Sequence, residues 1–100
     1  MKREGDFHLK IESGSSVVAA ANQVSCELAG EAAILNLRSG VYYGLNPVGA
    51  FIWKLIQQPQ PVAGLLEAVW QEYEVDRAKC EEDLMRLLND LAEHNLIETV

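Results

Sequence analysis

Residues 40–49, Gly-Val-Tyr-Tyr-Gly-Leu-Asn-Pro-Val-Gly, contain a change in the hydrophobic pattern from strand to helix. The first part, Val41–Leu45, is rich in β-branched and aromatic residues and carries no charge, which is typical of a strand. Asn46 is then a good N-cap, and Pro47 suits the first position of a helix. The pattern therefore predicts that a strand ends and a helix begins at Asn46.

Two further strands are predicted before this point. Apolar Val24, Cys26 and Leu28 alternate with polar residues, which is the period of a half-buried strand. A second run, Ala33–Leu37, follows after a turn signal at Ala29-Gly30. Because short turns join each strand to the next, we expect an antiparallel three-stranded meander whose first and third strands are its edges.

Three helices are predicted after the strands. The first ends before the prolines at 59 and 61, since proline cannot continue a helix. The second carries an apolar stripe as far as Tyr73, and the third is capped by Asp76 and runs to about His94. Residues 96–100 would form a short extended tail. The order predicts an α+β fold of the winged helix-turn-helix type, with a three-stranded antiparallel meander followed by three helices.

The length of 100 residues allows one compact domain. Met1–Ser16 is polar and is predicted to be a flexible arm, with the folded domain spanning residues 17–100. No apolar run reaches the length of a membrane span, and the arm lacks the apolar segment of a secretory signal. We therefore expect a cytoplasmic protein without a membrane partner.

The cysteines and histidines give no sign of catalysis or metal binding. Cys26 and Cys80 are far apart, and both are expected to be small buried side chains. His8 and His94 do not pair with them at metal-ligand spacing. The chain also lacks a nucleophile–base constellation and a phosphate-binding loop. The sequence thus predicts a protein that is not an enzyme and that needs no metal or cofactor.

The charge argues against nucleic acid as a partner. The net charge is -7, whereas phosphate backbones are bound by Lys and Arg. The third predicted helix, which would enter the major groove in a DNA-binding winged helix, carries six acidic residues against three basic ones. An acidic surface favours a neutral or basic partner instead.

Two features suggest where a partner binds. The strand Val41–Leu45 is an edge without charge, and proteins normally protect such edges, so it is either an aggregation hazard or a binding site. Alternation places Tyr42 and Tyr43 on opposite faces, while Trp53 is expected in the core. The third helix is apolar over half of its circumference. Either it is the central helix of the core, or its margin at Cys80, Leu84 and Leu87, with Asp83 beside it, lines an open groove.

The ordered motifs resemble those of PqqD-like proteins, the recognition elements for precursors of ribosomally made, modified peptides (RiPPs). The stretch at 40–49 carries most of the resemblance, and Asn36-Leu37 and Ile52-Trp53 on either side also match. The resemblance covers residues 17–97, and within the family it is strongest to the stand-alone B1 proteins of lasso-peptide biosynthesis. It continues through Tyr73, Val75-Asp76, Asp83-Leu84, Leu87-Leu88, Leu91 and Asn95-Leu96-Ile97.

The resemblance implies that the protein binds the leader segment of a precursor peptide as an extra strand beside its third strand. Leader side chains would enter a groove between that strand and the third helix, and the module would present the precursor to processing enzymes. For the lasso branch these are a B2-type leader peptidase of the cysteine-protease class and an ATP-dependent macrolactam cyclase. The predicted peptide-binding residues are Val41, Tyr42, Tyr43, Gly44, Leu45, Cys80, Asp83, Leu84 and Leu87.

Two alternatives remain open from the sequence. The first is a PqqD-type carrier of a quinone-cofactor precursor or another RiPP precursor, for which the partner would be a radical SAM enzyme. The second is an acidic winged-helix module that acts in regulation through protein–protein contacts.

Overall fold

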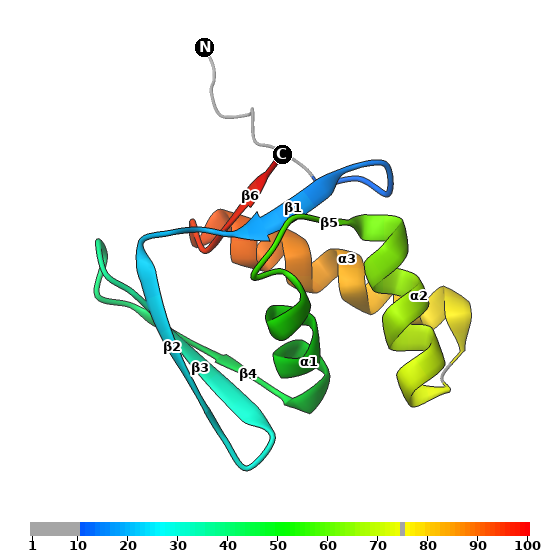
Figure 1. Ribbon diagram of the computed structural model, residues 1–100, viewed down its shortest axis with the longest axis horizontal. Coiled ribbons are helices and arrows are strands. Elements are labelled where there is room, and N and C mark those ends of the chain that lie inside the picture. Colours follow the sequence, from blue (N-terminus) through cyan, green and yellow to red (C-terminus); the bar gives the residue numbers. More distant parts are fainter. Residues whose placement is uncertain (1–10, 75) are drawn as a thin grey trace.

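The computed structural model describes residues 11–74 and 76–100, which form three helices and two small antiparallel sheets (Figure 1). The first sheet contains β2 (Gln23–Leu28), β3 (Glu31–Asn36) and β4 (Tyr42–Leu45) in that order. The predicted α+β fold and its meander are therefore confirmed, with β2 and β4 as the edges.

The second sheet was not predicted. It contains β5 (Gln60–Pro61), β1 (Ser16–Ala19) and β6 (Ile97–Thr99), with β1 in the centre. Val17 lies opposite Thr99, so the pairing joins segments from the two ends of the described chain. The predicted extended tail is thus a strand, but its partner is too distant in sequence for a local pattern to indicate it.

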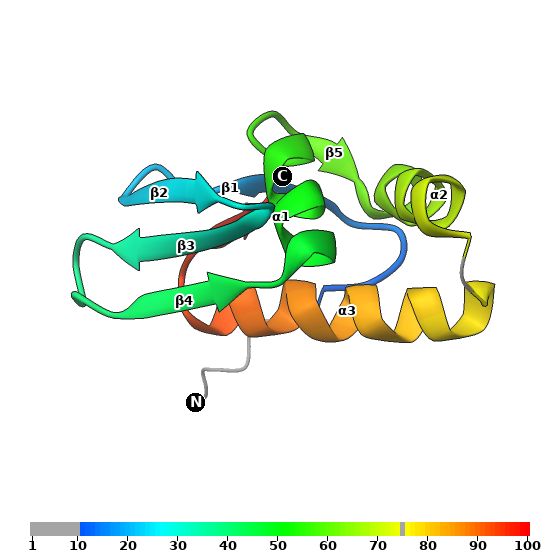
Figure 2. The same cartoon turned by 90° about the horizontal axis from the view of Figure 1, so that it is seen from below.

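Two of the three helices follow the predicted start signals. In α1 (Pro47–Leu55), the Asn46 side chain caps the helix by accepting a hydrogen bond of 2.8 Å from the Gly49 amide. The helix α2 (Val62–Tyr73) begins directly after Pro61. In α3 (Arg77–Glu93), the Asp76 carboxylate accepts a bond of 3.0 Å from the Lys79 amide. In the view of Figure 2, α3 runs along the lower side of the molecule, below β4, α1 and α2.

The core lies between the helices and the inner faces of the sheets. Ile34 of β3, Ile52 of α1 and Leu88 of α3 are among its fully buried residues. Trp53 is also buried, as predicted, and its Nε1 donates a hydrogen bond of 3.1 Å to Ser25 Oγ on β2. This bond fixes α1 against the sheet, and the core positions the strand and helix that border the candidate site.

The prediction that both cysteines are buried was wrong for Cys26. Cys80 is buried in α3, but Cys26 is exposed on β2. Its neighbour Ser25 faces Trp53, so alternation along the strand turns Cys26 to the opposite face, where no helix covers it. The apolar spacing of β2 therefore does not mark a buried strand.

The boundary of the predicted arm also differs. Residues 1–10 lie outside the described residues, but Ile11 is buried in the core. Its amide donates a hydrogen bond of 2.9 Å to the Asn89 side chain of α3, and Ser16 already belongs to β1. The part of the predicted arm that is described is thus packed on the domain. Within the described chain, no helix combines the length and the hydrophobicity of a membrane span.

Candidate functional site

The open edge of β4 presents backbone groups to one side of the sheet. The Asn36 amide donates to the Val41 carbonyl at 3.0 Å, which makes these two residues a hydrogen-bonded pair in the register of β3 and β4. Because such pairs alternate in antiparallel sheets, Tyr43 and Leu45 also turn their backbone groups toward β3. Tyr42 and Gly44 must then turn their N–H and C=O groups outward.

The two tyrosines of β4 lie on opposite faces, as predicted. The Tyr42 side chain is 71% exposed on the outer face, whereas Tyr43 is half-buried and shares the inner face with Ile34. The structure thus decides which side of the strand points toward α3. It is the side of Tyr43 and Leu45.

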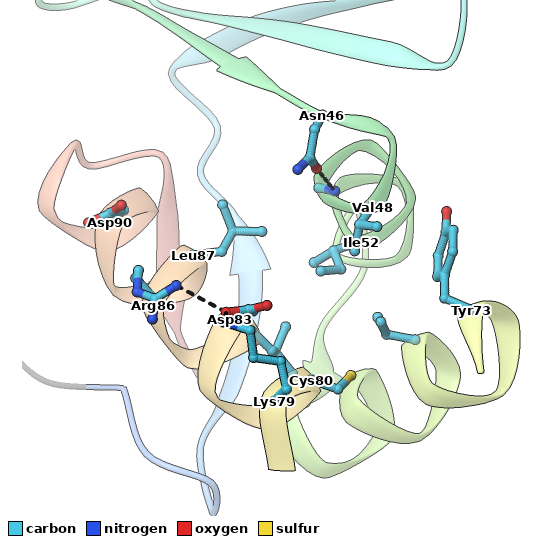
Figure 3. Close-up of a pocket in the computed structure, with 13 residues that line it drawn as sticks. Asn46, Val48, Ile52, Tyr73, Lys79, Cys80, Asp83, Arg86, Leu87 and Asp90 are labelled. Carbon is cyan, nitrogen blue, oxygen red and sulfur yellow. Dashed lines mark hydrogen bonds and ion pairs between the residues drawn. The ribbon is translucent and has the colours of Figure 1, made fainter. Parts of the chain in front are cut away.

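A cavity of about 470 Å³ opens where the three helices meet, just beyond the end of β4 (Figure 3). This volume is within the range of binding pockets for small groups and side chains. Apolar side chains from all three helices form its interior, and charged side chains of α3 form its rim. It is lined by Asn46, Val48, Gly49, Ile52, Val69, Tyr73, Lys79, Cys80, Asp83, Leu84, Arg86, Leu87 and Asp90.

The four predicted site residues of α3 all line this cavity. Cys80 and Leu84 are buried in its wall, Leu87 is half-buried, and Asp83 is exposed at the rim. The five predicted residues of the strand, 41–45, do not line it, although Asn46 directly after them does. The structure therefore places the predicted residues in two adjoining parts, an open edge and a cavity.

The charges on the rim are mostly neutralised within α3. The Asp83 carboxylate lies 3.0 Å from Arg86 Nη1 and 3.4 Å from Lys79 Nζ. Arg86 also reaches Glu82 at 3.6 Å. Both cations are thus directed toward the middle of the helix, and Figure 3 shows the Arg86 side chain turned toward Asp83.

Tyr43 connects β4 to α3. Its hydroxyl donates a long hydrogen bond of 3.4 Å to Asp90 Oδ2, and its ring meets that of His94 edge-on with centroids 5.2 Å apart. Burial, and then the neighbouring Asp90 carboxylate, raise the pKa of the Tyr43 hydroxyl above its ordinary value. The phenol is therefore neutral at physiological pH and acts as a donor.

Asn36 fixes the turn between β3 and β4 against the end of α3. Its side-chain amide donates to the His94 carbonyl at 2.9 Å, and its Oδ1 accepts bonds from the amides of Arg38 and Ser39. The residue is 4% exposed, so these bonds satisfy a buried polar group. Asn36 thereby fixes one end of β4 relative to α3.

The lining of the cavity is suited to binding an apolar group. Burial raises the pKa of the Cys80 thiol, Asp83 raises it further, and Arg77 lowers it, so the thiol is not activated as a nucleophile. Across residues 11–74 and 76–100, no three His, Cys, Asp or Glu side chains are grouped to hold a metal ion. An apolar interior with a polar rim suits an apolar side chain of a ligand.

Several lining residues were missed in the sequence. Val48 and Ile52 were named only among the residues that carry the resemblance, and Asp90 was counted only among the six acidic residues of the third helix. Asp90 lies three residues after Leu87, so helical spacing from the predicted margin identifies it. For α1 and α2, no sequence signal shows which residues of an apolar stripe line the cavity and which pack in the core.

Comparisons with known proteins identify the family. The sequence profile described as coenzyme PQQ synthesis protein D (PqqD) matches residues 31–97. No curated protein sequence matches the chain. The solved structure of TbiB1 in complex with the TbiA(beta) leader peptide is similar, with a TM-score of 0.75 and 34% sequence identity, over 81% of this chain and 94% of that one. Since the profile match spans most of the chain and contains all of β3, β4 and α3, the chain belongs to the PqqD family.

Proposed function

We propose that the protein binds the leader segment of a ribosomally made precursor peptide and presents it to processing enzymes in lasso-peptide maturation. The observation that carries this proposal is the open, uncharged edge of β4 beside an apolar cavity. The similarity to TbiB1, whose structure contains a leader peptide, supports it. The protein acts in the cytoplasm, by binding and not by catalysis.

The leader adds to β4 as a further strand. Its backbone bonds to the outward groups of Tyr42 and Gly44, which gives affinity without depending on sequence. Alternate leader side chains then face inward, toward α3 and the cavity. An apolar leader residue fills the space between Ile52 and Leu87, and this contact provides selectivity.

The peptide-binding residues differ in their contributions. Val41, Tyr43 and Leu45 hold β4 on β3, so they position the edge and shape its inner face. Leu87 is half-buried and contacts the leader directly. Cys80 and Leu84 are buried and form the cavity wall, and Asp83 with its two cations forms the rim.

The processing partners are proposed from the lasso branch of the family. They are a leader peptidase of the cysteine-protease type and a macrolactam cyclase that uses ATP. The peptidase cleaves at the end of the leader and the cyclase acts on the segment that follows, so a module that holds the leader by its strand leaves both places accessible.

A second candidate is a carrier for the precursor of a quinone cofactor. The family description as coenzyme PQQ synthesis protein D favours it specifically. Both candidates use the same edge and cavity, and they differ in the precursor that is bound.

Titration of the protein into fluorescently labelled TbiA(beta) leader, followed by anisotropy, tests the proposal. We expect saturable binding, and weaker binding of a labelled precursor from a quinone-cofactor pathway. The reverse order of affinities would favour the second candidate. The absence of saturable binding to both peptides would contradict strand addition at β4.

A further inference from the structure

We propose that Asp90 selects leaders that carry a Lys or Arg side chain on the inward face of the added strand. This inference rests on the proposed function, because it assumes that a strand adds to β4. It assigns a charge preference to one end of the site, next to Tyr43.

The position of Asp90 favours a contact with the leader. Asp90 lines the cavity at the end nearest Tyr43, and the Tyr43 hydroxyl reaches its carboxylate. Side chains on one face of a sheet alternate along each strand, and neighbours across strands lie about 4.5–5.5 Å apart at Cβ. A leader residue beside Tyr43 on the inner face therefore points toward Asp90, whichever way the leader runs.

The charge of Asp90 is not neutralised by α3. Within residues 11–74 and 76–100, no ion pair joins its carboxylate to a cation. Arg86, one turn earlier, pairs with Glu82 and Asp83 instead. Figure 3 shows its contact with Asp83. The only hydrogen bond of the Asp90 carboxylate to a described residue is the long one from Tyr43.

Asp83 is the other acidic residue of the cavity, and it does not offer the same site. It already has two cations within 3.4 Å, so a leader cation would have to displace one of them. At Asp90 a Lys or Arg adds an opposite charge without displacing an ion pair described here. The Tyr43 ring beside it also provides an aromatic face for the cation.

The position of the cation relative to the apolar anchor follows from the strand. Tyr43 and Leu45 share the inner face of β4, and the cavity opens just after Leu45. A leader residue at Asp90 and a leader residue in the cavity therefore both face inward. Their separation in the leader must be an even number of residues.

Selection of random 12-residue peptides displayed on phage tests this inference. Selection on the wild-type protein should enrich peptides with Lys or Arg at an even spacing from an apolar residue. The Asp90→Asn variant keeps the shape of the side chain and should lose this preference. Synthetic copies of the enriched peptides should bind to it about three- to fivefold more weakly. The Asp90→Lys variant should instead select Asp or Glu at that position.

The matched control is Glu81→Gln, which removes one charge from α3 at a residue outside the cavity. It should leave both the preference and the affinity within about twofold. Apolar peptides without a basic preference, or a preference that persists in Asp90→Asn, would overturn the role of Asp90 while leaving strand addition intact. A selection that enriches no peptide at all would overturn the proposed function and this inference together.

Discussion

The two edges of the β2–β3–β4 sheet are alike in backbone and different in surroundings. The Leu37 amide donates to the Asn22 carbonyl, so the same alternation turns the backbone groups of Ser25 and Glu27 outward on β2. Beside β2 there is a cavity of about 290 Å³ with Lys54 and Gln57 in its lining. Beside β4 the cavity is larger, and three helices contribute apolar residues to it.

Under the proposed function, the difference implies that an open edge is not sufficient for a binding site. Both edges offer hydrogen bonds to any extended peptide, but only β4 lies beside an apolar cavity that all three helices line. On β2, Glu27 also pairs with Lys54 at 3.2 Å, and charge on an edge strand discourages strand addition. The cavity, more than the edge, should therefore decide where a leader binds.

The largest expected effect is that of a charge in the β4-side cavity. The Leu87→Glu variant places a carboxylate where an apolar leader side chain would bind, and it should weaken leader binding about 100-fold. The domain should remain folded, because Leu87 is only half-buried. Anisotropy measures the binding and circular dichroism the fold.

Two further variants control for this result. Gln57→Glu introduces the same carboxylate beside β2 and should leave leader binding unchanged. Leu88→Glu buries the charge in the core at a fully buried position, which costs several kcal/mol of the roughly 5–15 kcal/mol that stabilises a domain, and should unfold it. If Leu87→Glu unfolds the protein as Leu88→Glu does, then α3 is a core helix without an open margin.

A smaller effect is expected from proline on the edges. Gly44→Pro removes an outward amide from β4, and each lost hydrogen bond costs about 0.5–1.5 kcal/mol, with the bulk of the ring in addition. Leader binding should fall about tenfold with little change in the melting temperature. Tyr43→Pro removes an amide that bonds to β3, so it should lower the melting temperature instead.

Glu27→Pro is the matched change on the β2 edge. It removes an outward amide as well and should leave leader binding unaltered. Equal losses of affinity from Gly44→Pro and Glu27→Pro would mean that the two edges are equivalent, and the argument from the cavity would be wrong.

The smallest expected effect is a change in the alkylation rates of the two cysteines. Cys26 on β2 is exposed, whereas Cys80 is buried in the β4-side cavity. Alkylation of the native protein by iodoacetamide, followed by mass spectrometry, should modify Cys26 first. In the free protein Cys80 should react more slowly than Cys26. A bound leader should slow the reaction of Cys80 by a further several-fold and should not affect the reaction of Cys26. A leader that protects Cys26 instead would place the peptide on β2.

The same reaction should depend on pH in a defined direction. Because burial and Asp83 raise the pKa of the Cys80 thiol above its ordinary value of 9.0, less than half of it is thiolate at pH 9. The alkylation rate of Cys80 should therefore reach half of its maximum only above pH 9. A half-maximal rate at or below pH 9 would contradict the raised pKa.

The local parts of the fold were predictable from the sequence. The caps at Asn46 and Asp76, the turn at Ala29-Gly30 and the alternation of β4 are all short-range signals, and the structure has them where they were expected. The pairing of β1 with β6 was not predictable, because it joins residues that are about 80 positions apart. The exposure of Cys26 depends on which strand α1 covers, and that is also a tertiary property.

The candidate site was predictable only in outline. The periodicity of α3 placed Cys80, Leu84 and Leu87 on one margin, and the structure brings them together in one cavity. Val48 and Tyr73 line the cavity because of the way α1 and α2 pack against α3. The sequence patterns of α1 and α2 carry no information about that packing. The outward direction of Tyr42 and Gly44 required the hydrogen bond from Asn36, because alternation alone leaves two registers equally good.

The bonds of Asn36 have a consequence for the thermodynamics of leader binding. Since this buried side chain ties the β3–β4 turn to the carbonyl of His94 at the end of α3, the walls of the site are already in place before a peptide arrives. The loss of conformational entropy on binding then falls almost entirely on the leader, which has to become extended. Binding should release heat and be opposed by entropy. A leader made rigid in an extended shape, for example by cyclisation through its outward side chains, should bind more tightly without any new contact.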